Sequence, residues 1–163
     1  MNTFWEKVLE WKYEMKYENI NLIFDMDGVL AEYKYGEGDA IIKNIDGAFI
    51  NKRPLYSIVN KVIELSKLSY TDIYIISSCF SRKHEYEKDT WLNKYIPFIK
   101  KENRLYSYCK TFNECNEKKV VLIKKIIKCK SPLVIIDDEH DVLRQLKNCN
   151  KDILLFHISS LID

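Results

Sequence analysis

Two acids, Asp25 and Asp27, follow the short apolar run 22–24 and stand directly before Gly28. A short apolar run that ends in a turn signal is typical of a buried strand. In an open α/β sheet, ligands bind just beyond the carboxyl ends of such strands. Two carboxylates at that position attract a hard cation such as Mg²⁺, which prefers oxygen ligands. With the metal in place, one carboxylate can attack a phosphorus atom and the other can move a proton.

A second pair of acids, Asp137 and Asp138, follows the strongly apolar run 132–136. Adjacent carboxylates at a strand end repel each other unless a cation neutralises them. A metal ion shared with Asp25 would offset this repulsion. One acid of the pair would bind the ion directly, and the other would bind through water or orient a lysine. The sequence leaves open which acid takes which role.

The segment 25–30, Asp-Met-Asp-Gly-Val-Leu, resembles the DxDG signature of the haloacid dehalogenase (HAD) superfamily of phosphohydrolases. The resemblance implies that Asp25 is the nucleophile that becomes an aspartyl-phosphate and that Asp27 is the general acid and base. The Ile-Asp-Asp ending at Asp137 and Asp138 is similar to the acidic motif with which this family holds Mg²⁺. The implied metal ligands are therefore Asp25, the backbone carbonyl of Asp27, and the acidic pair.

Hydroxyl and basic residues match the two remaining motifs of the family. Ser77 ends an apolar run and matches the hydroxyl that binds the transferring phosphoryl group, with Ser78 assisting through its backbone N–H. Lys119 is the first choice, and Lys118 the second, for the lysine that neutralises the nucleophile and the phosphate. Lys88 lies in a segment similar to a helix of the 5'(3')-deoxyribonucleotidase branch. It either reaches the substrate or is a solvated surface lysine.

The composition is that of an ordinary globular chain. The 163 residues are 47% hydrophobic and 31% charged, with a net charge of +2, which argues neither for nor against a nucleic-acid partner. No apolar run approaches the length of a membrane span, and the N-terminus lacks the apolar core of a signal peptide, so we expect a cytoplasmic protein with no membrane partner. Five scattered cysteines without a CxxC pair predict reduced thiols and no zinc site.

The hydrophobic periodicity predicts alternating strands and helices across one domain, 1–163. An amphipathic helix within 1–18 would pack on the domain or on a second copy of the chain, in a homodimer. The further helices expected are 54–68, 82–95, one that Asn116 caps, and 141–146. The strands expected are 21–25, 71–76, 104–108, 132–136 and 153–156. His84 and His140 are expected on the surface, and Cys79 is expected to be a small buried residue.

The stretch 31–52 has no strong helical period and holds three of the four glycines. In the HAD family a cap is inserted at this point, so the resemblance implies a minimal lid of about twenty residues. Tyr33, Tyr35 and Phe49 are candidates for stacking on a substrate ring. The alternative, which we favour, is that these aromatic side chains pack the lid onto the core.

These observations predict a three-layer, Rossmann-like HAD fold with a mostly parallel central sheet and a minimal cap. The resemblance implies a Mg²⁺-dependent phosphatase that acts through an aspartyl-phosphate. The expected partner is a phosphorylated small molecule, a nucleoside monophosphate, as for a 5'-nucleotidase. Two alternatives remain. One is a larger phosphorylated substrate, such as a nucleic-acid end or a phosphoprotein, and the other is a non-catalytic binding module that kept the fold.

Overall fold

The computed structural model describes residues 3–33, 38, 45–130, 132–147, 149–150 and 152–161. Five parallel strands form one sheet in the order β3-β2-β1-β4-β5. The strands are β1 (Ile20–Asp25), β2 (Thr71–Cys79), β3 (Arg104–Tyr108), β4 (Leu133–Asp137) and β5 (Ile153–His157). The helices are α1 (Phe4–Glu14), α3 (Tyr56–Leu65), α4 (Arg82–Tyr95), α5 (Phe112–Ile127) and α6 (His140–Leu146). Short 3-10 turns span Lys101–Asn103 and Ile158–Leu161.

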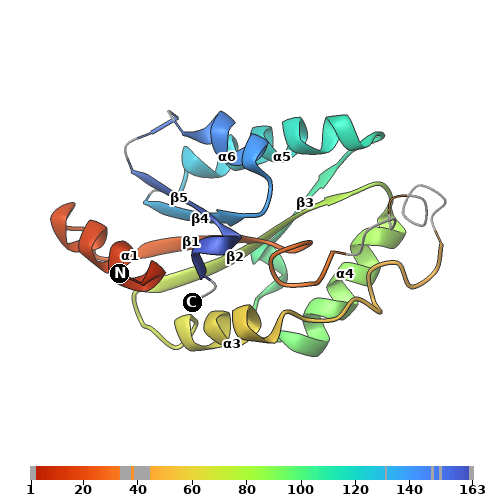
Figure 1. The fold of residues 1–163 in the computed structure, drawn as a ribbon, viewed down its shortest axis with the longest axis horizontal. Helices are drawn as coiled ribbons and strands as arrows, with labels where there is room; N and C mark the ends of the chain where they lie inside the picture. The colour runs from red at the N-terminus through yellow and green to blue at the C-terminus, as the bar shows by residue number, and fades with distance from the viewer. Residues whose placement is uncertain are drawn as a thin grey trace.

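The sheet is covered by helices on both faces, with α5 and α6 on one face and α3 and α4 on the other (Figure 1). The faces of β1 show why: Leu22 and Phe24 pack with residues of α1, α3 and α4, whereas Ile23 packs with residues of α5 and α6. Strands buried on both faces read as continuous apolar runs rather than as alternating ones. The predicted Rossmann-like, three-layer α/β class is confirmed.

The strand β1 lies at the centre of the sheet, between β2 and β4. Asp25 lies opposite Ile76 of β2, and Phe24 lies opposite Ile136 of β4. This register places Asp25 beside Ser77 on one side and beside Asp137 on the other. The parallel pairing therefore brings three of the sequence motifs to one edge of the sheet.

The start of α5 differs from the expectation. The prediction that Asn116 caps this helix is wrong, because the helix begins at Phe112. Thr111 caps it by accepting a hydrogen bond from the backbone N–H of Glu114. The Glu114 carboxylate in turn accepts the backbone N–H of Lys110 at 3.0 Å. Threonine followed three residues later by glutamate is a helix-start signature, so this start could have been found in the sequence.

The cysteines also differ from the expectation. Cys109 and Cys115 form a disulfide with their Cα atoms 5.3 Å apart, so the prediction that all thiols are reduced is wrong for this pair. The two residues meet because β3 ends at Tyr108 and α5 starts within four residues of it. Cys79 is a free, buried thiol, as expected.

The N-terminal helix α1 packs against this chain. Phe4 and Val8 are buried in the core, and the Phe4 ring meets the edge of Phe156 with centroids 4.7 Å apart. Thr3 caps the helix in a capping box with Glu6. Packing on the domain thus accounts for the apolar side of α1, and a homodimer through it stays a prediction. Of the helices in the described ranges, none is both long and apolar enough to cross a membrane.

Candidate active site

Three carboxylates converge beyond the ends of β1 and β4. Asp25, Asp137 and Asp138 each offer an oxygen, and these oxygens lie within 4.8 Å of one another. The pKa of Asp25 lies well above its ordinary value, chiefly because the carboxyl group is buried. The charge of Lys119 lowers this pKa, whereas the charges of Asp137 and Asp138 raise it further. The Asp25 Oδ1 atom is buried and has no hydrogen-bond partner among the described residues. A hard cation with oxygen ligands would satisfy that atom and relieve the repulsion, so the residues fit Mg²⁺.

Lys119 is the lysine at this cluster. Its Nζ lies 3.0 Å from Oδ2 of Asp25 and 3.2 Å from Oδ2 of Asp137. Burial would lower the pKa of Lys119, but the charges of the two carboxylates outweigh it and raise the pKa, so the ammonium stays charged. Lys118, the second choice, does not reach the cluster. Its side chain is 46% exposed and pairs with Glu114 along α5.

The structure gives the adjacent acids different positions. Asp137 is fully enclosed, since its Oδ1 accepts the backbone N–H of Glu139 at 2.9 Å and its Oδ2 contacts Lys119. Asp138 lines the cavity described below. Burial, followed by the charge of Asp137, raises the pKa of Asp138 to about 6. Asp137 is therefore placed to orient the lysine, and Asp138 is placed to meet a ligand.

Gly28 makes the close approach of Asp138 feasible. Its φ of +81° lies in the left-handed region that side chains disfavour. A Cβ atom at this position would lie 2.1 Å from Oδ2 of Asp138. The glycine of the DxDG segment thus suits the turn after β1 and leaves room for the Asp138 carboxylate in its present position.

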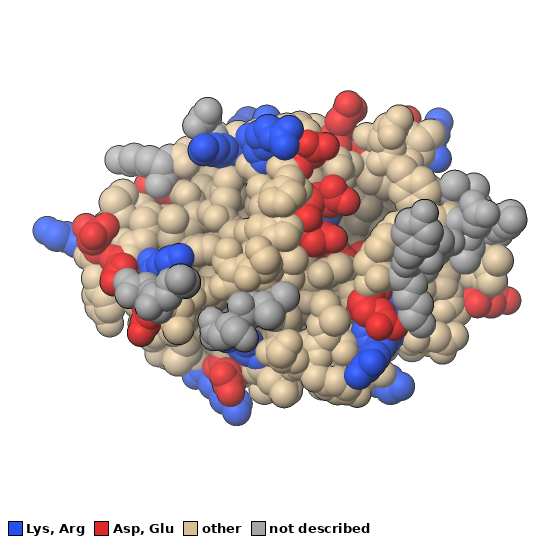
Figure 2. Space-filling view, viewed as in Figure 1, with Lys and Arg blue, Asp and Glu red and all other residues tan. Residues whose placement is uncertain are grey.

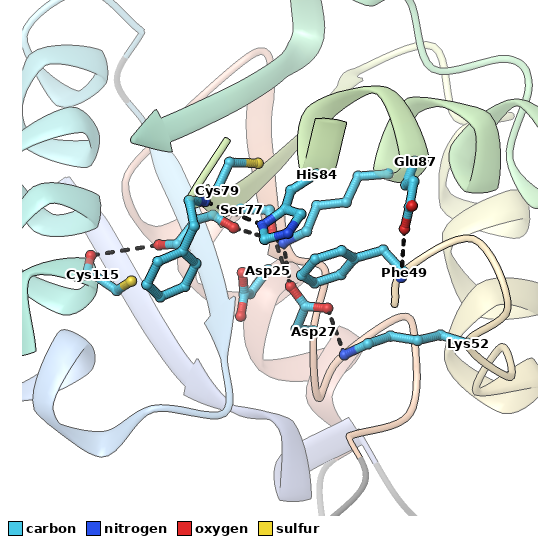
Figure 3. A network of polar contacts seen from close by, with 12 residues as sticks. Asp25, Asp27, Phe49, Lys52, Ser77, Cys79, His84, Glu87 and Cys115 are labelled. Carbon is cyan, nitrogen blue, oxygen red and sulfur yellow. Dashed lines mark hydrogen bonds and ion pairs between the residues drawn. The ribbon is translucent and has the colours of Figure 1, made fainter. Parts of the chain in front are cut away.

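A second polar network surrounds Asp27 (Figure 3). Lys52 Nζ lies 2.9 Å from Oδ1, and Lys88 Nζ donates to Oδ2. Burial would raise the pKa of Asp27, but the charges of Lys88 and Lys52 outweigh it and hold the pKa far below its usual range. Asp27 is therefore a fixed carboxylate between two ammonium groups.

Lys88 is buried, so the interpretation of this residue as a solvated lysine is wrong. Besides Asp27, its ammonium donates to Ser77 Oγ at 2.6 Å and to the Ser78 carbonyl at 2.7 Å. Ser77 Oγ also donates to Asp27 at 3.1 Å and is enclosed by this network. Ser78 rather than Ser77 lines the cavity, with its hydroxyl 3.0 Å from Ser107 Oγ.

Sequence reasoning missed Lys52 and Glu87. The Glu87 carboxylate accepts the backbone N–H groups of Gly47 and Phe49, and Trp91 Nε1 donates to the Lys52 carbonyl at 2.8 Å. Helix α4 thereby holds the described end of the 31–52 stretch and positions Lys52. For Glu87 a signal was present, because positions 84, 87, 88 and 92 share one helical face with the buried Trp91.

The same face explains the error over His84, which was expected on the surface and is fully buried. Its ring packs on Phe49 with centroids 4.9 Å apart, and burial, followed by the charge of Lys88, lowers its pKa. Phe49 is itself buried, which agrees with the favoured alternative that it packs the lid onto the core. Tyr33 is 58% exposed at the cavity, and Tyr35 lies outside the described residues. His140 is exposed, as expected.

A cavity of about 590 Å³ connects the two networks. Figure 2 shows the hollow, with acidic side chains along one side of it. Its charged lining includes Asp25, Asp27, Lys52, Lys88, Lys119 and Asp138. The volume falls in the range of sites that enclose a whole small molecule, and so exceeds what a phosphate group alone would need.

Comparisons with known proteins support the fold. No protein-family model and no curated protein matches the chain. The solved structures that resemble it include a chain of the Pnkp1/Rnl/Hen1 RNA repair complex, with a TM-score of 0.58 and 14% identity over 85% of this chain and 42% of that one. A second structure of the Pnkp1/Rnl/Hen1 complex contains a chain with a TM-score of 0.59 and 13% identity, over 86% and 46% respectively. The present chain thus spans less than half of each solved chain, and the likeness defines a shared fold.

Proposed function

We propose that this protein is a Mg²⁺-dependent phosphatase of the HAD type that forms an aspartyl-phosphate on Asp25. The observation that carries the proposal is the convergence of Asp25, Asp137 and Asp138 around one point, with Lys119 beside them. Structural ion pairs alone give a poor account of this cluster, because it contains a buried carboxylate oxygen that has no partner in the part of the chain that the structure describes. Perturbed carboxylates in a cleft are candidates for catalysis.

The ion would be held by Asp25, the Asp27 carbonyl and Asp138, with Asp137 in the outer layer, and would supply charge neutralisation for an incoming phosphate. Asp25 attacks phosphorus in line, and the alcohol leaves. Lys119 holds the attacking carboxylate in place and stabilises negative charge on the phosphoryl oxygens. Ser78, which lines the cavity, would donate a hydrogen bond to one of these oxygens.

Asp27 is proposed to protonate the leaving oxygen and then to take a proton from the water that attacks the aspartyl-phosphate. Its ion pairs with Lys52 and Lys88 keep it deprotonated in the free site. To donate a proton, Asp27 must first take one up from solvent, and it can do so only once an arriving phosphate dianion has drawn ammonium charge away from it. The two ammonium groups that pair with Asp27, those of Lys88 and Lys52, are the ones that would shift toward the phosphate.

The proposed substrate is a nucleoside monophosphate. The cavity has room for an organic group beyond the phosphate, and aromatic side chains line part of its wall. A phosphorylated nucleic-acid end is the second candidate, favoured by the likeness to chains of an RNA repair complex. A non-catalytic module is the remaining alternative.

The test is phosphate release from a panel of phosphate monoesters with Mg²⁺ and with EDTA. The panel contains p-nitrophenyl phosphate, the nucleoside 5'- and 3'-monophosphates, and a 5'- or 3'-phosphorylated oligonucleotide. We expect Mg²⁺-dependent release by the wild type and loss of it in Asp25→Asn. Asp72→Asn is the matched control, because Asp72 lies exposed near the opposite end of β2. If the wild type releases no phosphate from any of these esters, the enzyme proposal is wrong.

A further inference from the structure

Two phenylalanine rings form part of the cavity wall on the side of β2 and α5. Phe80 follows the last residue of β2, and Phe112 is the first residue of α5. Their rings meet edge to face, with centroids 4.9 Å apart and an interplanar angle of 66°. Neither ring belongs to the two core clusters among the described residues, and Phe112 is 41% exposed. An aromatic side chain that lines a cavity without serving the core is available to a ligand.

The pair is held in place before any ligand arrives. Phe112 lies within the short segment that the Cys109–Cys115 disulfide closes, directly after the capping residue Thr111. Phe80 donates its backbone N–H to Nδ1 of the buried His84 at 3.4 Å. A preformed aromatic surface costs little conformational entropy when a ligand stacks on it.

The surroundings of the pair suit a ring that carries hydrogen-bonding groups. Asn113 and Asn116 line the same cavity and lie on the first turns of α5 next to Phe112. A side-chain amide offers both a donor and an acceptor, as the edge of a nucleobase does. Ser78, two residues before Phe80, lines the cavity as well. The aromatic wall and the proposed phosphate site therefore belong to one continuous cavity.

The charges of the cavity favour a single nucleotide over a nucleic-acid strand. Three further acids, Glu117, Glu139 and Asp141, line it. The lysines that line it, Lys52, Lys88 and Lys119, each pair with a carboxylate of the site. A strand would bring additional phosphates past the acids, which repel them, whereas proteins that bind strands line the path with cations. The cavity therefore suits a ligand with one phosphoryl group, placed at the metal site, better than a ligand with several phosphates.

We propose that Phe112, backed by Phe80, is the stacking surface for the base of a nucleoside monophosphate whose phosphate lies at Asp25. The inference rests on the proposed function for the position of the phosphate, and it specifies the substrate class and the residue that selects it. Base-on-aromatic stacking tolerates all bases, because every base has a π face. The surface therefore distinguishes nucleotides from sugar phosphates rather than one base from another.

The test measures binding without turnover, by calorimetry on the full chain with Ca²⁺ in place of Mg²⁺, a cation that also takes oxygen ligands, after a check that no phosphate is released. The probes are the four ribonucleoside 5'-monophosphates and ribose 5-phosphate, which keeps the sugar and the phosphate but lacks the base. We expect the wild type to bind the nucleotides about tenfold more tightly than ribose 5-phosphate. Phe112→Ala should remove that preference and leave the affinity for ribose 5-phosphate unchanged within about twofold. Phe112→Trp should retain the preference.

Tyr86→Ala is the matched control, because Tyr86 is 70% exposed on α4 and does not line the cavity. Circular dichroism and thermal unfolding check that each variant is folded. The proposal is overturned if the wild type binds ribose 5-phosphate as tightly as the nucleotides, or binds neither. It is also overturned if Phe112→Ala weakens both ligands equally. Tighter binding of a 5'-phosphorylated oligonucleotide than of any mononucleotide would replace the proposed occupant with a strand.

This experiment separates the inference from the proposed function. If phosphate release fails but the nucleotide preference is present and depends on Phe112, the phosphatase proposal falls and the stacking surface stands. If phosphate release succeeds but Phe112→Ala changes no ligand preference, the phosphatase proposal stands and the stacking surface falls.

Discussion

Replacing Lys88 with methionine should destabilise the protein strongly, although the two side chains have similar length and apolar stems. The ammonium of Lys88 is fully buried and makes three hydrogen bonds, to the Asp27 carboxylate, the Ser77 hydroxyl and the Ser78 carbonyl. Removing one partner of a buried ion pair typically costs about 3–5 kcal/mol, because the other charge stays buried. Asp27 keeps Lys52 and is 21% exposed, so we expect about 2–4 kcal/mol.

The measurement is urea unfolding at pH 7 in EDTA, with the thermal midpoint as a second readout. The expected loss corresponds to about 4–16 °C in a domain of this size. Lys118→Met is the control, since its side chain is 46% exposed and should change the stability by less than about 0.5 kcal/mol. In the double variant Lys88→Met/Asp27→Asn, the loss should be smaller than the sum of the single losses. A Lys88→Met protein as stable as Lys118→Met would refute the buried network.

Three further outcomes follow from the site. Mg²⁺ at about 100 times its dissociation constant should stabilise the wild type by about 2.7 kcal/mol in thermal unfolding, and the Asp138→Asn protein should lose most of this gain. An equal gain in both proteins would contradict the assignment of Asp138 as a metal ligand. Gly28→Ala should lower the stability of the folded state by at least about 1–2 kcal/mol from its left-handed φ alone. It should also weaken Mg²⁺ binding, because the new Cβ displaces Asp138. Calorimetric titration with Mg²⁺ checks the binding, and an unchanged affinity would count against this role of Gly28. The metal-free protein should gain stability from Asp138 as the pH falls from 7 to 5. The folded state raises the pKa of this carboxyl group from 3.8 to about 6. The resulting contribution to the free energy of unfolding is complete below pH 3.8 and is lost as the pH rises through 6. Urea unfolding in EDTA should show a flatter pH slope for Asp138→Asn, and identical slopes would exclude this group as the source.

Residues at strand ends could be placed from the sequence with good accuracy. Apolar runs that stop at Asp25, Ser77 and Asp137 predict parallel strands, and parallel strands bring their carboxyl ends to one edge. The sequence left two questions open: whether Asp137 or Asp138 faces the cavity, and whether Lys118 or Lys119 reaches it. Both depend on the direction of side chains around a strand end and around a helix.

Lys88, His84 and Lys52, which the sequence misplaced or missed, lie on α4 and in the segment before α3. Charged residues on a helix are usually solvated, so Lys88 and His84 were underestimated. They are buried because they share a face with Trp91, and because the 45–54 segment folds back over that face. Lys52 reaches Asp27 only through this tertiary contact, and no periodicity in the sequence could have shown it.

The most direct test of the central claim is a crystal structure of the protein grown with Mn²⁺ and beryllium fluoride, a mimic of the phosphoryl group. The account predicts one anomalous peak for Mn²⁺ at coordination distance from Asp25 and Asp138, with the fluoroberyllate bonded to a carboxylate oxygen of Asp25. An ion bound elsewhere, or a fluoroberyllate that does not engage Asp25 while the ion is in place, would contradict the proposal that this carboxylate is the nucleophile.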